Sequence, residues 1–267
     1  MNRSLLLMLL LAAAGSVMPH DIIADDNWPR FRGPNADGVA ADNDRLPVTW
    51  NKSKNVEWVA DVPGWGWACP ILWGDQVFVS TVVSDEENDG PQKGLYLGQG
   101  VRTPAKGTHH WMVYCYDLKT GAVRWKYEAH TGQPKVPRHP KSTYASETPT
   151  TDGERLYVLF GDVGLYCFDY HGKQLWSHEI EPKKTFFDYG AAASPWAYNN
   201  RLFFLSEDGD TYVVEAGPEF KLLHSNSLDE LCLSTPAVSK EKLLVRTASK
   251  LYCITKSTSQ QTQDAAE

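Results

Sequence analysis

The chain has 267 residues, of which 42% are hydrophobic, and its formal net charge at pH 7 is −7. This length and apolar content are enough for one or two domains with a buried core. The negative charge argues against a nucleic-acid-binding surface. The sequence includes 10 Trp and 12 Tyr residues. Strands accommodate aromatic residues better than surface helices do, so the composition favours β-structure.

The N-terminus is typical of a secretory leader. Arg3 precedes an uncharged apolar run at residues 5–14, which is too short to span a bilayer comfortably. Small residues follow at 12–16, and Ala24 marks a second possible cleavage position. We predict a signal peptide at residues 1–24, cleaved between about residues 14 and 24, with an uncleaved anchor as the alternative. The protein is then expected to be exported, periplasmic or extracellular, with no membrane span after signal removal.

The strongest pattern is an internal repeat. Four segments carry a proline, then a polar or glycine pair four and five residues later, then an apolar run; they begin at Pro70, Pro149, Pro195 and Pro236. Gly and Asn permit the positive φ of a tight hairpin turn, and proline is tolerated where a strand begins. Each segment therefore predicts strand, turn, strand. The first repeat interval is lengthened by an insertion at residues 84–110.

A second signature follows in the same units. Cys115, Asp117, Thr120, Gly121 and Trp125 form it in full, and Cys167, Asp169, Gly172 and Trp176 repeat it with a turn one residue shorter. The Asp can accept hydrogen bonds from turn amides, and the Gly closes the turn. Trp58, Trp125 and Trp176 are expected to pack between units. Cys115, Cys167 and Cys253 share one strand position, which predicts a small buried core slot.

These residues resemble the pyrroloquinoline-quinone-type (PQQ-like) propeller repeat. Residues 28–35, 46–50 and 64–70 are similar to exported bacterial proteins named for this repeat, of a kind abundant in planctomycetes. The resemblance implies an all-β fold, a β-propeller of four-stranded blades. Related folds occur in quinoprotein alcohol dehydrogenases and in the lipoprotein subunit of the outer-membrane β-barrel assembly machine.

Such propellers usually close with seven or eight blades, whereas about four are present here. We therefore expect a partial or shortened propeller at residues 25–256, followed by a disordered tail at 257–267. Residues 190–194 are a candidate join. Residues 55–61 resemble a Trp-bearing last strand that the final unit lacks, so in a ring they could complete the C-terminal blade. An arc left open predicts marginal stability, closure into a small ring, or pairing, for instance as a homodimer.

The residues do not predict a catalytic set. A quinone dehydrogenase needs a Ca²⁺ ion held by oxygen ligands and a carboxylate base, and the resembling enzymes carry an adjacent Cys-Cys disulfide that this chain lacks. Residues 85–90 are not an EF-hand, because Tyr96 stands where the loop needs Glu. We expect no catalytic residues, no metal site and no cofactor, with PQQ and Ca²⁺ as the alternative.

Long loops on a rigid scaffold are common binding sites. The candidate ligand-binding residues lie in the segment before the first unit, the insertion and a basic connection; they are Trp65, Trp67, Arg102, His109, His110, Trp111, Lys135 and Arg138. The alternative is that these loops are merely exposed connections. We predict a non-catalytic binding or scaffold module for a protein or carbohydrate of the cell envelope. The alternatives are a quinone-dependent oxidoreductase and a shortened copy without function.

Overall fold

The computed structural model describes residues 27–40, 47, 49, 51–53, 55–87, 90–91, 102–182, 193–206, 208–230, 232, 236–239, 242–247 and 249–254. The predicted signal peptide, the predicted tail at 257–267, residues 190–192 of the candidate join and part of the insertion lie outside these residues. The described residues form strands and turns, and none of their segments is a helix long and apolar enough to cross a membrane.

Four antiparallel sheets follow one another along the chain, and each is built from strands in sequence order. The first contains β1 (Ile71–Trp73), β2 (Gln76–Ser84), β3 (His109–Asp117) and β4 (Val123–Gly132). The second contains β5 (Thr150–Thr151), β6 (Arg155–Phe160), β7 (Gly164–Asp169) and β8 (Gln174–Glu179). The all-β architecture of four-stranded blades is thus confirmed for these two units.

The third sheet repeats the plan with β9 (Trp196–Tyr198), β10 (Arg201–Leu205), β11 (Asp210–Glu215) and β12 (Leu222–Ser227). The last sheet has three described strands, β13 (Ala237–Ser239), β14 (Lys242–Arg246) and β15 (Leu251–Ile254). Each proline-led segment forms the first hairpin of its sheet, as the repeat pattern predicts. The turns use positive φ at Gly74, Gly153, Asn199 and Asn200, because such turns require left-handed residues.

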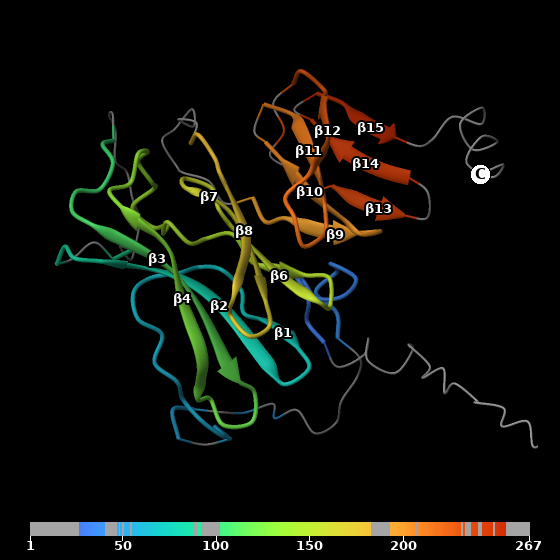
Figure 1. Cartoon of the computed structure of the whole chain (residues 1–267). Helices are drawn as coiled ribbons and strands as arrows, with labels where there is room; N and C mark the ends of the chain where they lie inside the picture. The colour runs from blue at the N-terminus through green and yellow to red at the C-terminus, as the bar shows by residue number, and fades with distance from the viewer. Residues whose placement is uncertain are drawn as a thin grey trace, which may run out of the picture.

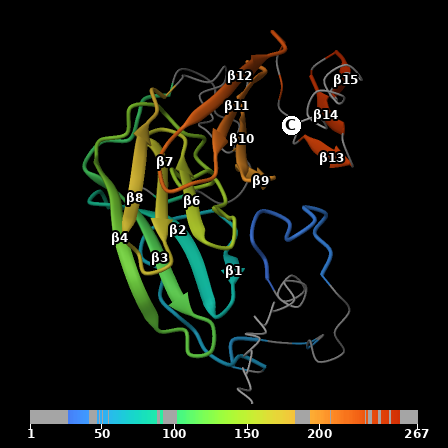
Figure 2. The same cartoon turned by 45° about the vertical axis from the view of Figure 1, so that its right-hand side comes forward.

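The sheets lie side by side as an open arc, a partial β-propeller (Figure 1). The sheet β1–β4 is at one end of the arc and β13–β15 is at the other, and the view turned by 45° shows the same order (Figure 2). β1, β5, β9 and β13 are the first strands of their sheets and form one edge of each. The N-terminal segment ties three sheets together: Trp28 pairs with Leu72, Pro29 accepts the Thr151 N–H, and Arg30 donates to the carbonyl of Ala197.

The core lies between neighbouring sheets. One cluster joins the first and second sheets, with Phe78 and Phe168 fully buried and Trp125 packed between them at 6.0 and 6.2 Å between ring centroids. A second cluster joins the second and third sheets through Tyr157, Trp176 and Leu202. Burial of large aromatic rings between sheets is the main apolar contribution to holding the blades together.

A repeated contact, here called the Trp dock, fixes the first sheet against the second and the second against the third. The indole N–H of Trp125 donates to the carbonyl of Tyr170 at 3.0 Å, and that of Trp176 donates to Gly217 at 3.0 Å. Trp58 docks in the same way on the carbonyl of Leu118 in the first sheet, at 2.9 Å. The chain therefore holds three docks in series, and the first comes from a segment that precedes the first sheet.

Two expectations need correction. Residues 55–61 form no ladder with any described strand, and Trp58 lies on the β3–β4 turn of the first sheet instead of completing the last one. The prediction of a small buried core position is confirmed for Cys115 and Cys167, but it is wrong for Cys253, which is exposed. The reason is that the slot faces the following sheet, and among the described residues no sheet follows β13–β15.

Candidate functional site: the rim around Tyr144

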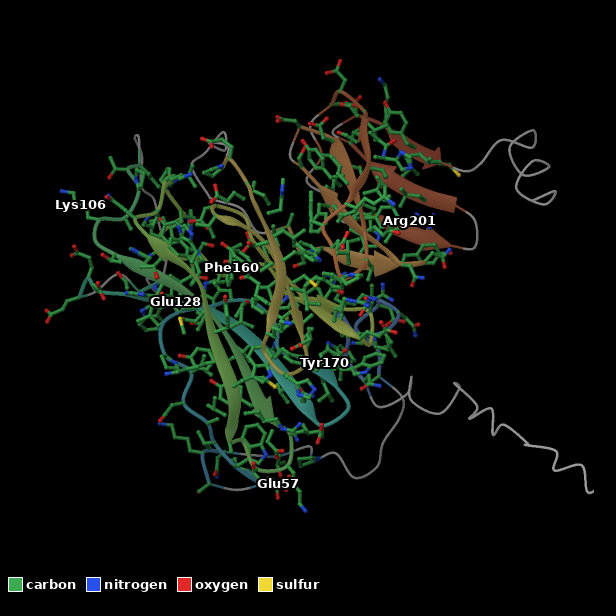
Figure 3. The ribbon with its side chains drawn as sticks, in the orientation of Figure 1. Glu57, Lys106, Glu128, Phe160, Tyr170 and Arg201 are labelled. Carbon is green, nitrogen blue, oxygen red and sulfur yellow. The ribbon has the colours of Figure 1, made fainter. Side chains whose placement is uncertain are left out.

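The two ends of each sheet have different roles. In the first sheet, register places Ser84, His109 and Gly132 side by side at one end, and Gln76 and Asp117 at the other. The second end carries the Trp docks. Figure 3 shows Lys106 at the first end and Glu57 at the opposite end, beside the β3–β4 turn. Three long connections meet at the first end, which we call the rim: residues 62–70, the β2–β3 connection and the β4–β5 connection.

Two exposed indoles stand on the rim, as expected from their place before the first unit. The exposed fractions of Trp65 and Trp67 are 51% and 57%. Trp65 is held by two backbone hydrogen bonds to Val82, at 2.9 and 3.1 Å. Trp67 donates its indole N–H to the carbonyl of Lys141 at 2.6 Å and its backbone N–H to Ala145 at 2.9 Å. Both rings are therefore exposed on a fixed backbone.

Tyr144 joins two of the three connections, and the third bonds to the neighbouring residue Ala145. Its hydroxyl accepts the N–H of Ala105 at 3.2 Å and donates to the carbonyl of Val136 at 3.1 Å. The guanidinium of Arg138 lies over its ring, 5.3 Å from the centroid, and also donates to the carbonyl of Ser142. This cation–π contact holds a positive charge on the rim. Tyr144 was not predicted as a site residue, because only its tertiary contacts distinguish it.

Basic side chains gather on the same surface. Lys141 is exposed, while Arg102, Arg138 and His139 are partly buried. Burial lowers the pKa of His139, and the charges of Arg102 and Lys141 add to the lowering, which places all three groups within electrostatic reach of one another. Trp65, Trp67, Arg102, Arg138, His139 and Lys141 are called the rim surface below.

His109 and Trp111 form a floor under this surface and are not exposed, which corrects the expectation that they would offer contacts to a ligand. Both are fully buried. The imidazole of His109 meets the Tyr144 ring edge-on at 5.5 Å, and Trp111 meets His130 edge-on at 5.2 Å. They are buried because their alternate positions on β3 point toward the second sheet, where the first core cluster lies.

His110 and Lys135 lie apart from this group. His110, between the two buried positions, points the other way and contacts Glu128 at 2.9 Å and Asp85 at 3.6 Å. This contact explains part of the lowered pKa of Glu128, whose largest cause is the hydrogen bond from Thr131. Lys135 is exposed and near enough to His130 to help lower its pKa, although burial is the larger cause. Six of the eight predicted residues therefore lie at the rim. Arg138, His109 and Trp111 contact Tyr144 directly. Trp67 bonds to the neighbouring Ala145, Trp65 bonds to Val82, and Arg102 lies near His139.

Two buried carboxyl groups lie at the same end of the second sheet. Glu147 accepts the N–H groups of Gly161 and Ser146 at 3.0 and 3.2 Å, and burial raises its pKa to about 8. Burial also raises the pKa of Asp162 to about 7, while the nearby indole of Trp111 and the charge of His109 act in the opposite direction. The charge of Asp162 contributes to the rise at Glu147, so the two groups form an interacting pair.

No sequence pattern predicts this pair of buried carboxyl groups. Glu147 stands between polar residues before Pro149, and Asp162 stands in a turn sequence where an exposed acid is common. Their burial results from the β4–β5 connection folding over the β6–β7 turn, which is a tertiary contact. Among the described residues, no group of three or more His, Cys, Asp or Glu side chains is placed to hold a metal ion.

The repeat residues at the other end have structural surroundings. Asp117 Oδ1 accepts the N–H groups of Lys119 and Thr120, and Asp169 Oδ1 accepts those of His171 and Lys173. Gly121 and Gly172 have φ of 69° and 85°, and a Cβ at either would lie 2.4 or 2.6 Å from the ring of Trp58 or Trp125, respectively. Glycine is thus required twice over, by the backbone conformation and by the close approach of the docked indole.

The cysteines do not form a reactive site. All five are free thiols, and Cys115 and Cys167 lie in different sheets. Burial raises the pKa of each of these two thiols to about 12, so both are protonated at neutral pH. A thiol in this state is a poor nucleophile and metal ligand.

The arc of antiparallel sheets and the repeated Trp docks define a β-propeller of PQQ-like repeats. The family model described as outer membrane protein assembly factor BamB matches residues 38–263, and the chain belongs to this family. No curated protein matches the chain significantly.

Among solved structures, BamB from Moraxella catarrhalis is similar at 14% identity and a TM-score of 0.30, with 74% of each chain covered. A europium-containing methanol dehydrogenase is similar at 11% identity and a TM-score of 0.36, over 62% of this chain and 24% of that one. The computationally designed Ika8 protein has 11% identity and a TM-score of 0.36, over 56% of this chain and 44% of Ika8. The chain thus spans less than half of the last two proteins.

Proposed function

We propose that the chain is an exported, non-catalytic binding module whose rim surface holds an acidic segment of a protein partner in the cell envelope. The carrying observation is that three separate connections place two exposed indoles and a group of basic side chains at one end of the first sheet. The family description, which names an outer membrane protein assembly factor, and the leader-like residues 1–24 support export and a protein partner.

The charge of the rim surface supports an acidic partner. The whole chain has a net charge of −7, whereas Arg102, Arg138 and Lys141 are gathered at one end of the first sheet. A local excess of positive charge on an acidic protein orients an acidic partner and repels basic ones. The indoles of Trp65 and Trp67 add large, rigid contact area at little entropic cost, which is typical of binding hot spots.

Binding is testable with fluorescence anisotropy of a labelled oligo-glutamate peptide carrying tyrosines. We expect saturable binding that weakens as NaCl is added, because exposed charges are screened by salt. The double variant Arg138→Glu and Lys141→Glu should weaken binding by at least about tenfold. Lys126→Glu, an exposed position on β4 away from the rim, is the matched control and should change affinity little.

Two outcomes would contradict the proposal. Equal binding of an oligo-lysine peptide would show that charge does not select the partner. Binding of a cello-oligosaccharide, lost in Trp65→Ala and Trp67→Ala but not in the charge-reversal variant, would make the surface a sugar-stacking platform instead.

A quinone-dependent oxidoreductase is the alternative that the repeat suggests. The residues present do not fit that cofactor: the described part of the chain offers no three-residue acidic or histidine group for a cation, and no two cysteines are adjacent in the sequence. Dye reduction by the purified protein with added PQQ and Ca²⁺ would contradict the non-catalytic proposal.

A further inference from the structure

The last sheet presents an apolar face that the other sheets bury. On β15, Leu251 is 70% exposed, and the side chain of Cys253, which lies on the same face two residues later, is exposed as well. The equivalent cysteines of the first two sheets, Cys115 and Cys167, are completely buried against the sheet that follows. The exposed face is therefore the surface on which a further sheet would pack.

The outer edge of the same sheet also lacks its neighbour among the described residues. In the first two sheets the third strand pairs with a Trp-bearing fourth strand, with Cys115 opposite Trp125 and Cys167 opposite Trp176. β15 pairs with β14 alone. The printed residues 255–267 contain no tryptophan and no large apolar residue that could repeat this pairing.

Residues 55–61 complement the last sheet: they carry the tryptophan pattern of an outer strand but belong to no described sheet. They come just before β1, the first strand of a sheet, as the outer strands β4 and β8 come before β5 and β9. Trp58 already makes the dock of an outer strand on the next sheet. The segment pairs with no described strand, and Val59 on its outward side is 81% exposed. The carbonyl of Asp61 at its end accepts the Tyr116 hydroxyl, while the backbone around Val59 is in no ladder and is open to a strand alongside it.

The segment and β15 of one chain lie at opposite ends of the arc in both views, so they do not meet within one copy (Figures 1 and 2). We propose that two copies form a ring in which residues 55–61 of each pair with β15 of the other. The arrangement is two-fold symmetric, since each copy gives one strand and receives one. Two copies with four sheets each supply eight sheets, within the range of roughly four to eight blades for closed propellers.

This pairing buries what one copy leaves exposed. By the register of the complete sheets, Trp58 of one copy lies opposite Cys253 of the other and is then enclosed between two sheets, as Trp125 is. Leu251 and Cys253 pack on the first sheet of the second copy. The proposal concerns assembly and does not depend on what the rim surface binds.

The register predicts a specific crosslink. Tyr114 lies opposite Lys126 and Tyr166 opposite Ser177, so Tyr252 should lie opposite Val59 of the other copy. Directly opposed strand residues are close enough for a disulfide. We suggest Val59→Cys and Tyr252→Cys as separate single variants, both in a background of Cys69→Ser and Cys253→Ser to remove the thiols that are not buried.

Mixing the two single variants under oxidising conditions should give a covalent dimer on a non-reducing gel, because the two cysteines are on different chains. Val59→Cys mixed with Leu222→Cys, an exposed position on the outer strand β12, is the control and should give none. If the mixture gives no dimer, or if a chain carrying both Val59→Cys and Tyr252→Cys forms only an internal crosslink, pairing between copies is overturned.

The unaltered protein provides an independent measurement. Light scattering behind a sizing column should give about twice the mass of one chain, and Val59→Pro should give one chain mass without loss of the β circular-dichroism spectrum. Proline has no backbone N–H to give to a ladder with β15, whereas within its own copy this segment is in no ladder. A wild-type protein that remains monomeric would overturn the proposal even if a cysteine variant failed to fold.

Discussion

At the scale of single residues, the buried carboxyl pair is the least expected feature of this chain. Glu147 and Asp162 are held in a low-dielectric environment near the floor of the rim, and both titrate near neutral pH. A carboxyl group with a raised pKa in the folded state keeps its proton longer than in the unfolded chain. The free energy of unfolding is therefore highest at low pH, where the group is protonated in both states. It falls as the pH rises from the unfolded pKa to the folded pKa.

The first prediction is that the wild-type protein loses stability between about pH 4 and pH 8, and that Asp162→Asn reduces this loss. The variant cannot ionise and also removes a charge that raises the pKa of Glu147. Relative to wild type, we expect it to gain on the order of 4 kcal/mol between pH 4 and pH 9, at about 1.4 kcal/mol per pKa unit. Urea unfolding across this pH range measures the difference.

A constant difference between wild type and Asp162→Asn at all pH values would show that Asp162 does not change protonation in the folded protein. Asp210→Asn, a partly buried acid at the start of β11 in a different sheet, is a suitable control. Its effect should not follow the same pH profile, because it is remote from the rim.

The residues of the rim were only partly accessible to sequence reasoning. Trp65, Trp67 and Arg138 could be chosen because aromatic and basic residues in long connections are conspicuous in a sequence. His109 and Trp111 were placed on the surface, although the alternation of β3 buries them, because the facing sheet is not visible in the sequence. Tyr144, Glu147 and Asp162 were missed since only contacts between distant segments distinguish them.

At the scale of elements, the Trp dock is the unit that repeats. An indole from an outer strand donates a hydrogen bond to a turn of the next sheet, and in two of the three docks its ring lies against a glycine with positive φ. Both the positive φ and the close approach of the indole favour glycine at this position. A pair of substitutions can distinguish these two effects.

The second prediction is that Gly172→Ala destabilises the protein more than Gly74→Ala. Both positions have positive φ, at 85° and 60°, so both variants carry a backbone cost of about 1 kcal/mol. A Cβ at Gly172 would lie 2.6 Å from the ring of Trp125, whereas nothing lies within 4 Å of one at Gly74. We expect an additional loss of roughly 1–3 kcal/mol for Gly172→Ala from overpacking. Thermal or urea unfolding gives both values.

Equal losses for the two glycine variants would mean that the docked indole shifts freely and that the dock contributes little. A double variant with Trp125→Ala separates the two cases further, because Gly172→Ala should then cost no more than Gly74→Ala.

The hairpins could be predicted from sequence, because their signals lie within a few residues: a proline, a turn pair and an apolar run. The structure of the outer-strand segment at residues 55–61 was harder to predict. Residues 55–61 carry the pattern of a Trp-bearing strand and make its dock, yet they form no ladder with the described strands. A strand requires a neighbour to pair with, and where that neighbour lies is a question of the whole arrangement.

At the scale of the whole molecule, burial decreases along the arc. The first two sheets contain most of the completely buried large side chains, including Trp111, Tyr157 and Phe168, whereas β15 at the far end is largely exposed. Stability in such an arc is approximately a sum over sheets and their contacts with neighbours. A sheet packed on one side only should open more easily than one packed on both.

The third prediction is a gradient in hydrogen exchange. Amides of β6 and β7 should exchange slowest, and those of β15 fastest, in a dilute sample that is monomeric. Mass spectrometry of peptides covering these strands measures the rates. Slower exchange in β15 than in β6 would show that the last sheet is protected by contacts that its exposed side chains do not reveal.

The number of sheets was predictable from the spacing of the prolines, and the fold class from the repeat. The same count predicts an open arc. It does not predict what covers the exposed sheets at the two ends of the arc, because that depends on surfaces brought together only by folding or assembly.

The docks have a consequence for how such a chain can change over evolutionary time. Each dock joins a sheet only to its immediate neighbour, and its parts are a tryptophan and a turn carbonyl that recur from one unit to the next. Deleting or duplicating a unit that carries both parts of the dock therefore leaves the docked junctions on either side with a compatible pair of surfaces. Gene rearrangements in steps of one blade should be far better tolerated than shorter insertions within a strand, so that ring size can vary while the junctions stay constant.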